Sequence, residues 1–137
     1  MLSVSSYSKD YVDACRARVA AQLASYRKVL ASKPLEIDAF ERQFFNHMIL
    51  ALDHYFLHRS RNMEGKHGNP LNEVRMLSNA IMENESRLSA DKTIRYKPET
   101  SILKFEVSDE IRLNTDDFGR LSAAFFDEIE KRYPQRS

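Results

Sequence analysis

The spacing of the apolar residues changes near position 93, and this change limits the fold more than any other feature of the sequence. Before it, apolar residues recur at steps of three and four, which is the period of amphipathic helices. After it, they alternate with polar residues, which is the period of a half-buried strand. The chain is therefore predicted to be an α+β protein, with three helices before a small antiparallel sheet and one helix after it.

Three helices are predicted before the change of period. The first spans residues 8 to about 32, with Ser8 as its N-cap and Lys33-Pro34 as its end. The second spans about 37–62, and its apolar side chains cover nearly half of its circumference. This breadth predicts a long central helix that contacts several neighbours. The third spans about 69–85, where an asparagine-proline pair supplies the N-cap and the first helical residue.

An antiparallel hairpin is predicted from about 102 to 113, with 93–97 as a candidate third strand. The side chains that alternate toward the core are Leu103, Phe105, Val107, Ile111 and Leu113. A last helix is predicted to begin at Asn114 or Thr115 and to end at Pro134. Together these elements give a helical domain in which three helices flank the central one and a small sheet precedes the last.

The composition limits the partners of this chain. Its 137 residues suit a single domain, 1–137, and its 21 basic and 20 acidic side chains leave a net charge of +1. Such a balance argues against a nucleic-acid partner, which needs a basic surface. An apolar run long enough to span a membrane is missing, as is a signal peptide, so we predict a cytoplasmic protein without a membrane partner. No cofactor motif is found, and no cofactor is predicted.

Residues 54–75 are the candidate functional region. They hold two of the three glycines and three of the four histidines, a density of polar groups that core packing does not require. The candidate ligand-binding side chains are His54, His58, Arg61, Glu64, His67, Asn69, Asn72 and Arg75. Because no complete catalytic set is present, we predict a non-enzymatic binding or interaction protein, although the sequence leaves open whether the protein is an enzyme.

A small anionic ligand fits the middle of this region. Gly65 and Gly68 precede the N-terminus of the predicted third helix, where unpaired N–H groups and the helix dipole attract anions. The basic side chains expected to cluster nearby are Arg59, Arg61, Lys66 and His67. The alternative is that the glycines only allow a tight turn between two helices.

A metal site is the competing hypothesis for the same region. His54 and His58 stand four residues apart, a spacing that lets two histidines of one helix hold one ion. A third ligand would have to be Glu64, His67 or a distant residue. The alternative function is accordingly a small metal-dependent enzyme with a His54/His58 site, and the simpler reading is a half-exposed histidine pair at a helix interface.

Self-association is predicted from a second apolar patch on the central helix. Leu50 and Leu57 lie away from its main apolar face, and three helices with a small sheet do not cover both faces. Exposed apolar patches often mark interfaces, so a homodimer is expected. Gly119, in the first turn of the last helix, predicts the close approach of another backbone, either a strand or a partner subunit.

Overall fold

The computed structural model describes residues 3–32 and 37–137, and this part of the chain is largely helical. The prediction of an α+β fold with an antiparallel hairpin or three-stranded sheet is wrong, because the described residues contain only a two-stranded parallel sheet of two-residue strands. In chain order the elements are β1 (Tyr7–Ser8), α1 (Lys9–Ala31), α2 (Ile37–Tyr55), α3 (Arg61–Glu64), α4 (Pro70–Glu83), the 3-10 turn η1 (Pro98–Thr100), α5 (Thr115–Arg132) and β2 (Gln135–Arg136). None of the helices among these residues is long and apolar enough to cross a membrane.

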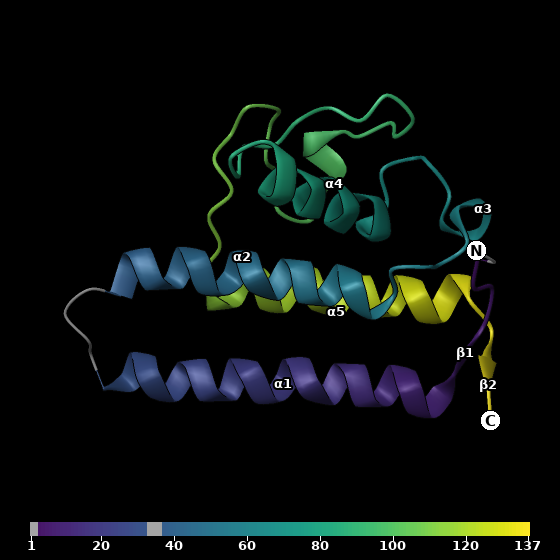
Figure 1. The fold of residues 1–137 in the computed structure, drawn as a ribbon, viewed down its shortest axis with the longest axis horizontal. Helices are drawn as coiled ribbons and strands as arrows, with labels where there is room; N and C mark the ends of the chain where they lie inside the picture. The colour runs from purple at the N-terminus through teal and green to yellow at the C-terminus, as the bar shows by residue number, and fades with distance from the viewer. Residues whose placement is uncertain (1–2, 33–36) are drawn as a thin grey trace.

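The helices form three layers (Figure 1). α2 and α5 lie side by side in the middle, α1 covers one face of this pair, and α4 covers the other. Buried apolar side chains fill the space between the layers, and the largest include Phe45 of α2 with Phe118 and Phe125 of α5. The predicted central position of the second helix is therefore confirmed, but α2 shares that position with α5.

Three of the four predicted helix starts are confirmed by their caps. The Ser8 hydroxyl accepts a hydrogen bond from the backbone N–H of Tyr11, and α1 follows. Asn69 and Asn114 each form a reciprocal capping box at the start of α4 and α5. The predicted end of the first helix at Lys33-Pro34 lies outside the described residues. A Cβ atom added at Gly119 would meet no described atom within 4 Å outside its own part of the helix, so the predicted close approach is not found.

α2 ends at Tyr55, seven residues before the predicted end. After it, Phe56 and Leu57 continue only as turns with i to i+3 hydrogen bonds. The cause is Arg59, whose side chain is fully buried and donates to the carbonyl oxygens of Phe56 and Leu71. A buried guanidinium must find acceptors for its donors, and these bonds draw the chain inward instead of along the helix axis. The sequence shows no glycine or proline at this point that would have predicted the break.

The segment predicted as a hairpin is a loop that is bound by the side chain of Glu73. Its buried carboxylate accepts hydrogen bonds from the backbone N–H groups of Ile102 and Leu103, at 2.8 and 2.9 Å. Burial raises the pKa of Glu73, and these two N–H groups oppose that rise. Backbone donors bound in this way are not available for pairing with a neighbouring strand.

The backbone of the loop also departs from an extended conformation at two points. Lys104 and Ser108 have φ values of 60° and 82°, in the left-handed region. Of the five side chains predicted to face the core, Ile111 and Leu113 are buried, two are half-buried, and Val107 is 49% exposed. The alternating pattern thus predicted the burial of part of this segment correctly, but its prediction of the secondary structure was wrong.

The two ends of the chain meet beside the last turn of α2. In the two-stranded sheet Tyr7 lies opposite Gln135. Upstream, the backbone N–H of Val4 donates to the carbonyl of His58, and Ser60 N–H donates to the carbonyl of Val4, both at 2.7 Å. These contacts place residues from both termini next to the start of the region that the sequence singled out (Figure 1).

Candidate functional site

The middle of the candidate region is a buried polar network centred on Glu64. This carboxylate is fully buried and accepts hydrogen bonds from Arg59 Nε at 2.9 Å, Arg75 Nη2 at 2.6 Å and Asn72 Nδ2 at 2.8 Å. Burial acts to raise the pKa of Glu64, but Arg75, Arg59 and Asn72 outweigh it and hold that pKa below its ordinary value. The charge is therefore compensated inside the protein, where an uncompensated carboxylate would be very unfavourable.

The anion-binding donors predicted at the start of α4 are already in use. The Asn69 side chain accepts from the N–H groups of Leu71 and Asn72, and the Asn72 side chain accepts from the N–H groups of Gly68 and Asn69. Proline at the first helical position supplies no N–H at all. Gly65 and Gly68 have positive φ values, as expected for a tight turn. The alternative reading of this loop, a connection between helices, accounts for its geometry.

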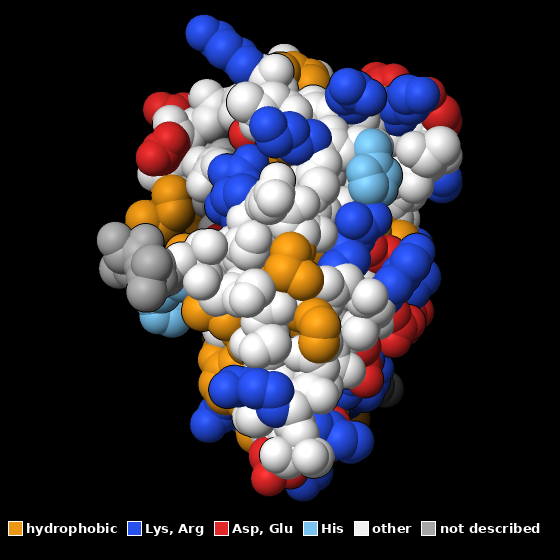
Figure 2. Space-filling model, turned by 90° about the vertical axis from the view of Figure 1, so that its right-hand side faces the viewer, with side chains coloured by type: hydrophobic (Ala, Val, Ile, Leu, Met, Phe, Trp, Pro, Cys, Tyr) orange, Lys and Arg blue, Asp and Glu red, His pale blue; other side chains and the backbone are white. Residues whose placement is uncertain are grey.

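Two of the candidates lie on the surface near this network. The Arg61 side chain is 47% exposed, and exposed His67 lies with its Nε2 2.9 Å from Arg132 Nη2. Figure 2, which faces the end of the molecule that carries the chain termini, shows many Lys and Arg side chains with Asp and Glu among them. This mixture does not form a surface of one charge sign.

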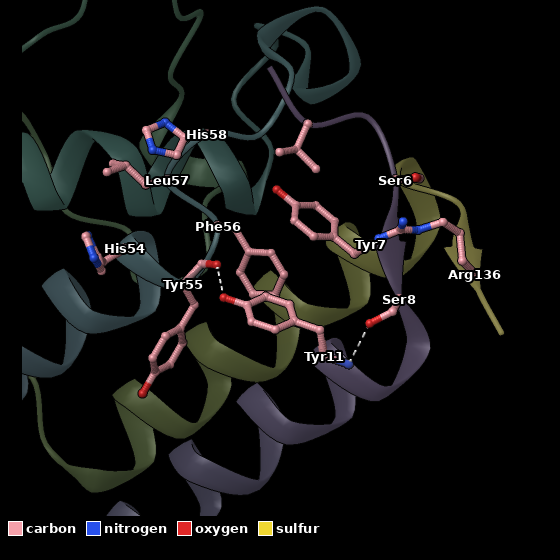
Figure 3. A pocket seen from close by; sticks show the side chains of 11 residues that line it. Ser6, Tyr7, Ser8, Tyr11, His54, Tyr55, Phe56, Leu57, His58 and Arg136 are labelled. Carbon is pink, nitrogen blue, oxygen red and sulfur yellow. Dashed lines mark hydrogen bonds between the residues drawn. The ribbon is translucent and has the colours of Figure 1, made fainter. Parts of the chain in front are cut away.

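The remaining two candidates, His54 and His58, line a groove that we call the terminal groove (Figure 3). Its volume is about 480 Å³. It is lined by Val4, Ser6, Tyr7, Ser8, Tyr11, His54, Tyr55, Phe56, Leu57, His58 and Arg136. The α2 end and its following turn form one wall, while the N-terminal segment, the first turn of α1 and β2 form the other.

The terminal groove combines an apolar floor with hydrogen-bond donors. Phe56 is almost fully buried and packs edge-on against the Tyr7 ring, with ring centroids 4.8 Å apart. Burial raises the pKa of both Tyr7 and Tyr11 to about 12, so both hydroxyls stay protonated at neutral pH. The Tyr11 hydroxyl donates to the carbonyl of Tyr55, whereas the buried Tyr7 hydroxyl has no hydrogen-bond partner among the described residues.

The polar side chains at the rim of the terminal groove are accessible to solvent. His54, His58 and Arg136 are exposed. None of the lining residues is an aspartate or glutamate. The lining therefore contains the positive charge of Arg136 and no negatively charged side chain.

The geometry does not favour the predicted metal site at His54 and His58. His54 is in the last turn of α2, and His58 follows after the helix has ended, so the regular four-residue helical spacing is lost. In Figure 3 the two imidazoles lie at different places along one wall. Among the described residues, no three histidine, cysteine, aspartate or glutamate side chains lie close enough together to hold a metal ion.

Sequence reasoning missed the wall of the terminal groove that comes from the chain ends. Tyr7, Tyr11 and Arg136 carry no local motif, and their proximity depends on the pairing of β1 with β2. No family model, curated protein or solved structure matches the chain. Function must therefore be inferred from the geometry and chemistry of the terminal groove and its surroundings.

Proposed function

We propose that this is a non-enzymatic binding protein whose terminal groove takes a small anionic ligand. The observation that carries the proposal is the set of eleven lining residues, which includes an arginine, two histidines, two serines and three tyrosines but no carboxylate. Within the groove no carboxylate orients a histidine, as histidine acid–base catalysis usually requires. This arrangement favours binding over catalysis.

The chemistry of the walls suggests a ligand with two parts. Tyr11, Phe56 and Leu57 offer an aromatic and apolar surface, and Leu57 is 43% exposed. Arg136 and His58 offer donors for a carboxylate or phosphate. The expected ligand is thus a small molecule with an apolar body and a single anionic group.

Calorimetric titration with phenyl phosphate tests the proposal. Arg136→Gln and His58→Gln should each weaken binding by about fivefold or more, since each removes one charged or polar partner of the anion. Arg61→Gln is the matched control, because Arg61 is exposed but lies outside the groove. Benzyl alcohol, the uncharged analogue, should bind at least about tenfold more weakly than phenyl phosphate. Equal loss in Arg61→Gln, or no difference between the two probes, would contradict the proposal.

Homodimer formation stays a prediction. Its support is the patch from which it was predicted: Leu57, just after the end of α2, is 43% exposed, while Leu50 of α2 is half-buried. Light scattering over a range of protein concentrations measures the mass directly. A dimer mass that persists on dilution would support the prediction, and the mass of a single chain at high micromolar concentration would count against it.

A further inference from the structure

A second groove lies along the boundary between α1 and α2. We call it the helix groove, and its volume is about 390 Å³. It is lined by Gln22, Phe40, Gln43, Phe44, His47, Met48, Ala51 and Tyr55. Tyr55, the last residue of α2, lines both grooves. At the helical rise per residue, the distance from Phe40 to Tyr55 is about 22 Å, or roughly four turns of a helix.

The floor of the helix groove is apolar and firmly packed. Phe44 stacks on Tyr26 with ring centroids 5.1 Å apart and on Phe40 at 5.8 Å. Phe40 nevertheless remains 46% exposed, so one side of its ring is open to a partner. An accessible aromatic surface on a rigid base is the kind of surface that buries an anchor residue of a partner.

The α1 side of the boundary carries a cation. Ala14, Arg18 and Ser25 follow Tyr11 at steps of three, four and seven, so they lie on one stripe of α1 with Tyr11, and all four are exposed. The Arg18 guanidinium lies over the Tyr55 ring, 6.0 Å from its centroid. On this stripe the small Ala14 side chain precedes Arg18, and Gln22, which lines the helix groove, follows it.

The charge around the two grooves selects the partner. Neither groove has an aspartate or glutamate among its lining residues, although the chain contains twenty. Arg18, His47, His54, His58 and Arg136 lie in or beside the grooves. A complementary partner carries apolar residues at helical spacing, to cover the aromatic floor, and carboxylates on its flanks, to meet these groups.

We infer that the two grooves together bind an acidic amphipathic helix of a partner protein, with apolar anchors in the helix groove and a carboxylate in the terminal groove. This inference rests on the proposed function, because the carboxylate takes the place of the small anion. Helix-in-groove recognition uses contacts at positions i, i+3 or i+4 and i+7, and four turns of helix supply them.

Selection from a phage-displayed library of amphipathic helical peptides, about eighteen residues long, tests the inference on the full chain. The selected peptides should contain more Asp and Glu than Lys and Arg, and the best of them should bind with a Kd below about 100 μM. Recovery of no binder, or of peptides without an acidic excess, would overturn the inference.

Charge and apolar variants then locate the binding of the best selected peptide. The double change Gln22→Glu and Gln43→Glu adds two carboxylates of matched shape at exposed positions in the helix groove, and should weaken binding by about tenfold. Asn79→Asp on the exposed face of α4 is the control and should change little. Phe40→Ser should weaken binding by about threefold or more, whereas Met82→Ser, which removes a 67% exposed side chain elsewhere, should not.

Three outcomes separate this inference from its rivals. Phenyl phosphate binding without any peptide binding would leave the proposed function in place and remove the helical partner. Peptide binding without phenyl phosphate binding would contradict the proposed function and, with it, the carboxylate contact in the terminal groove. A dimer that the double Gln22→Glu, Gln43→Glu variant converts to monomer would show that a second copy of the chain occupies the grooves, which would overturn the inference.

Discussion

Asn72→Ala should destabilise the protein strongly, although the sequence alone made Asn72 a candidate ligand-binding residue. The side chain is fully buried. Its amide donates to the Glu64 carboxylate and to the carbonyl of Gly65, at 2.8 and 3.0 Å. Its oxygen accepts from the N–H groups of Gly68 and Asn69, at 2.9 and 3.1 Å. Alanine removes all four bonds and leaves their partners in a site with little access to water.

The size of the loss follows from these four bonds. A net contribution of about 0.5–1.5 kcal/mol for each gives about 2–6 kcal/mol, and the bond to the charged carboxylate argues against the lower end of this range. We therefore expect a loss of about 3–5 kcal/mol in the free energy of unfolding. This is a large fraction of the roughly 5–15 kcal/mol typical of a folded domain. The corresponding fall in Tm is on the order of 10–20 °C.

Urea denaturation followed by circular dichroism measures this loss, with His58→Ala and Arg61→Ala as controls. Both control side chains are on the surface, and Arg61 approaches Glu64 only at 3.9 Å. Each control should lose no more than about 0.5 kcal/mol. A loss below about 1 kcal/mol in Asn72→Ala, or equal losses in all three variants, would refute the structural role assigned to Asn72.

Three further predictions concern the loop, the buried carboxylate and the glycines. Glu73→Gln should speed hydrogen exchange at Ile102 and Leu103 by about tenfold, while α5 exchanges as before. The reason is that a neutral amide has only one oxygen to accept from the two N–H groups. Unchanged exchange at these two residues would argue against Glu73 as the residue that anchors the loop. Because its neighbours hold the pKa of Glu64 below the ordinary value of 4.5, its ionised form stabilises the fold above that pH, and this contribution is lost as pH falls through the lowered pKa. The acid limb of the unfolding free energy should thus be shallower in Glu64→Gln than in the wild type, and parallel limbs would contradict this account. Gly119→Ala should stabilise the protein by about 0.5–1 kcal/mol, whereas Gly68→Ala should destabilise it by about 1–3 kcal/mol. Gly68 has a φ of +93°, and a Cβ atom there would lie 2.8 Å from the carbonyl oxygen of Arg95. Thermal unfolding of both variants checks that the two effects have opposite signs.

The sequence predicted the helices because their signals are local. Ser8, Asn69 and Asn114 cap helices within three residues of themselves, and the apolar period lies within each helix. The prediction of a hairpin was wrong because the contact that determines the conformation of this segment is not local. Glu73 binds Ile102 N–H from twenty-nine positions away, and alternation of apolar residues does not reveal such a partner. A loop that partly buries alternate side chains and a half-buried strand share the same two-residue pattern.

The candidate site at residues 54–75 stays a prediction, and the structure divides its residues between two places. The density of polar groups at 54–75 correctly marked an unusual segment, but density does not distinguish a buried network from a binding surface. The structure assigns Glu64 and Asn72 to the network and His54 and His58 to the terminal groove. Arg136 could not have been connected with them, because it reaches the groove only through the pairing of the chain ends.

Nuclear magnetic resonance mapping of phenyl phosphate on the full chain tests most directly the claim that the terminal groove is the functional surface. Two candidate regions are compared in one experiment, because the amides of the groove and of the 65–69 loop both report on bound anion. We predict ligand-dependent shifts at Tyr7, Tyr11, His58 and Arg136, all of which line the groove, and none at Lys66 or His67. Shifts confined to the 65–69 loop, with the groove resonances unmoved, would contradict the account.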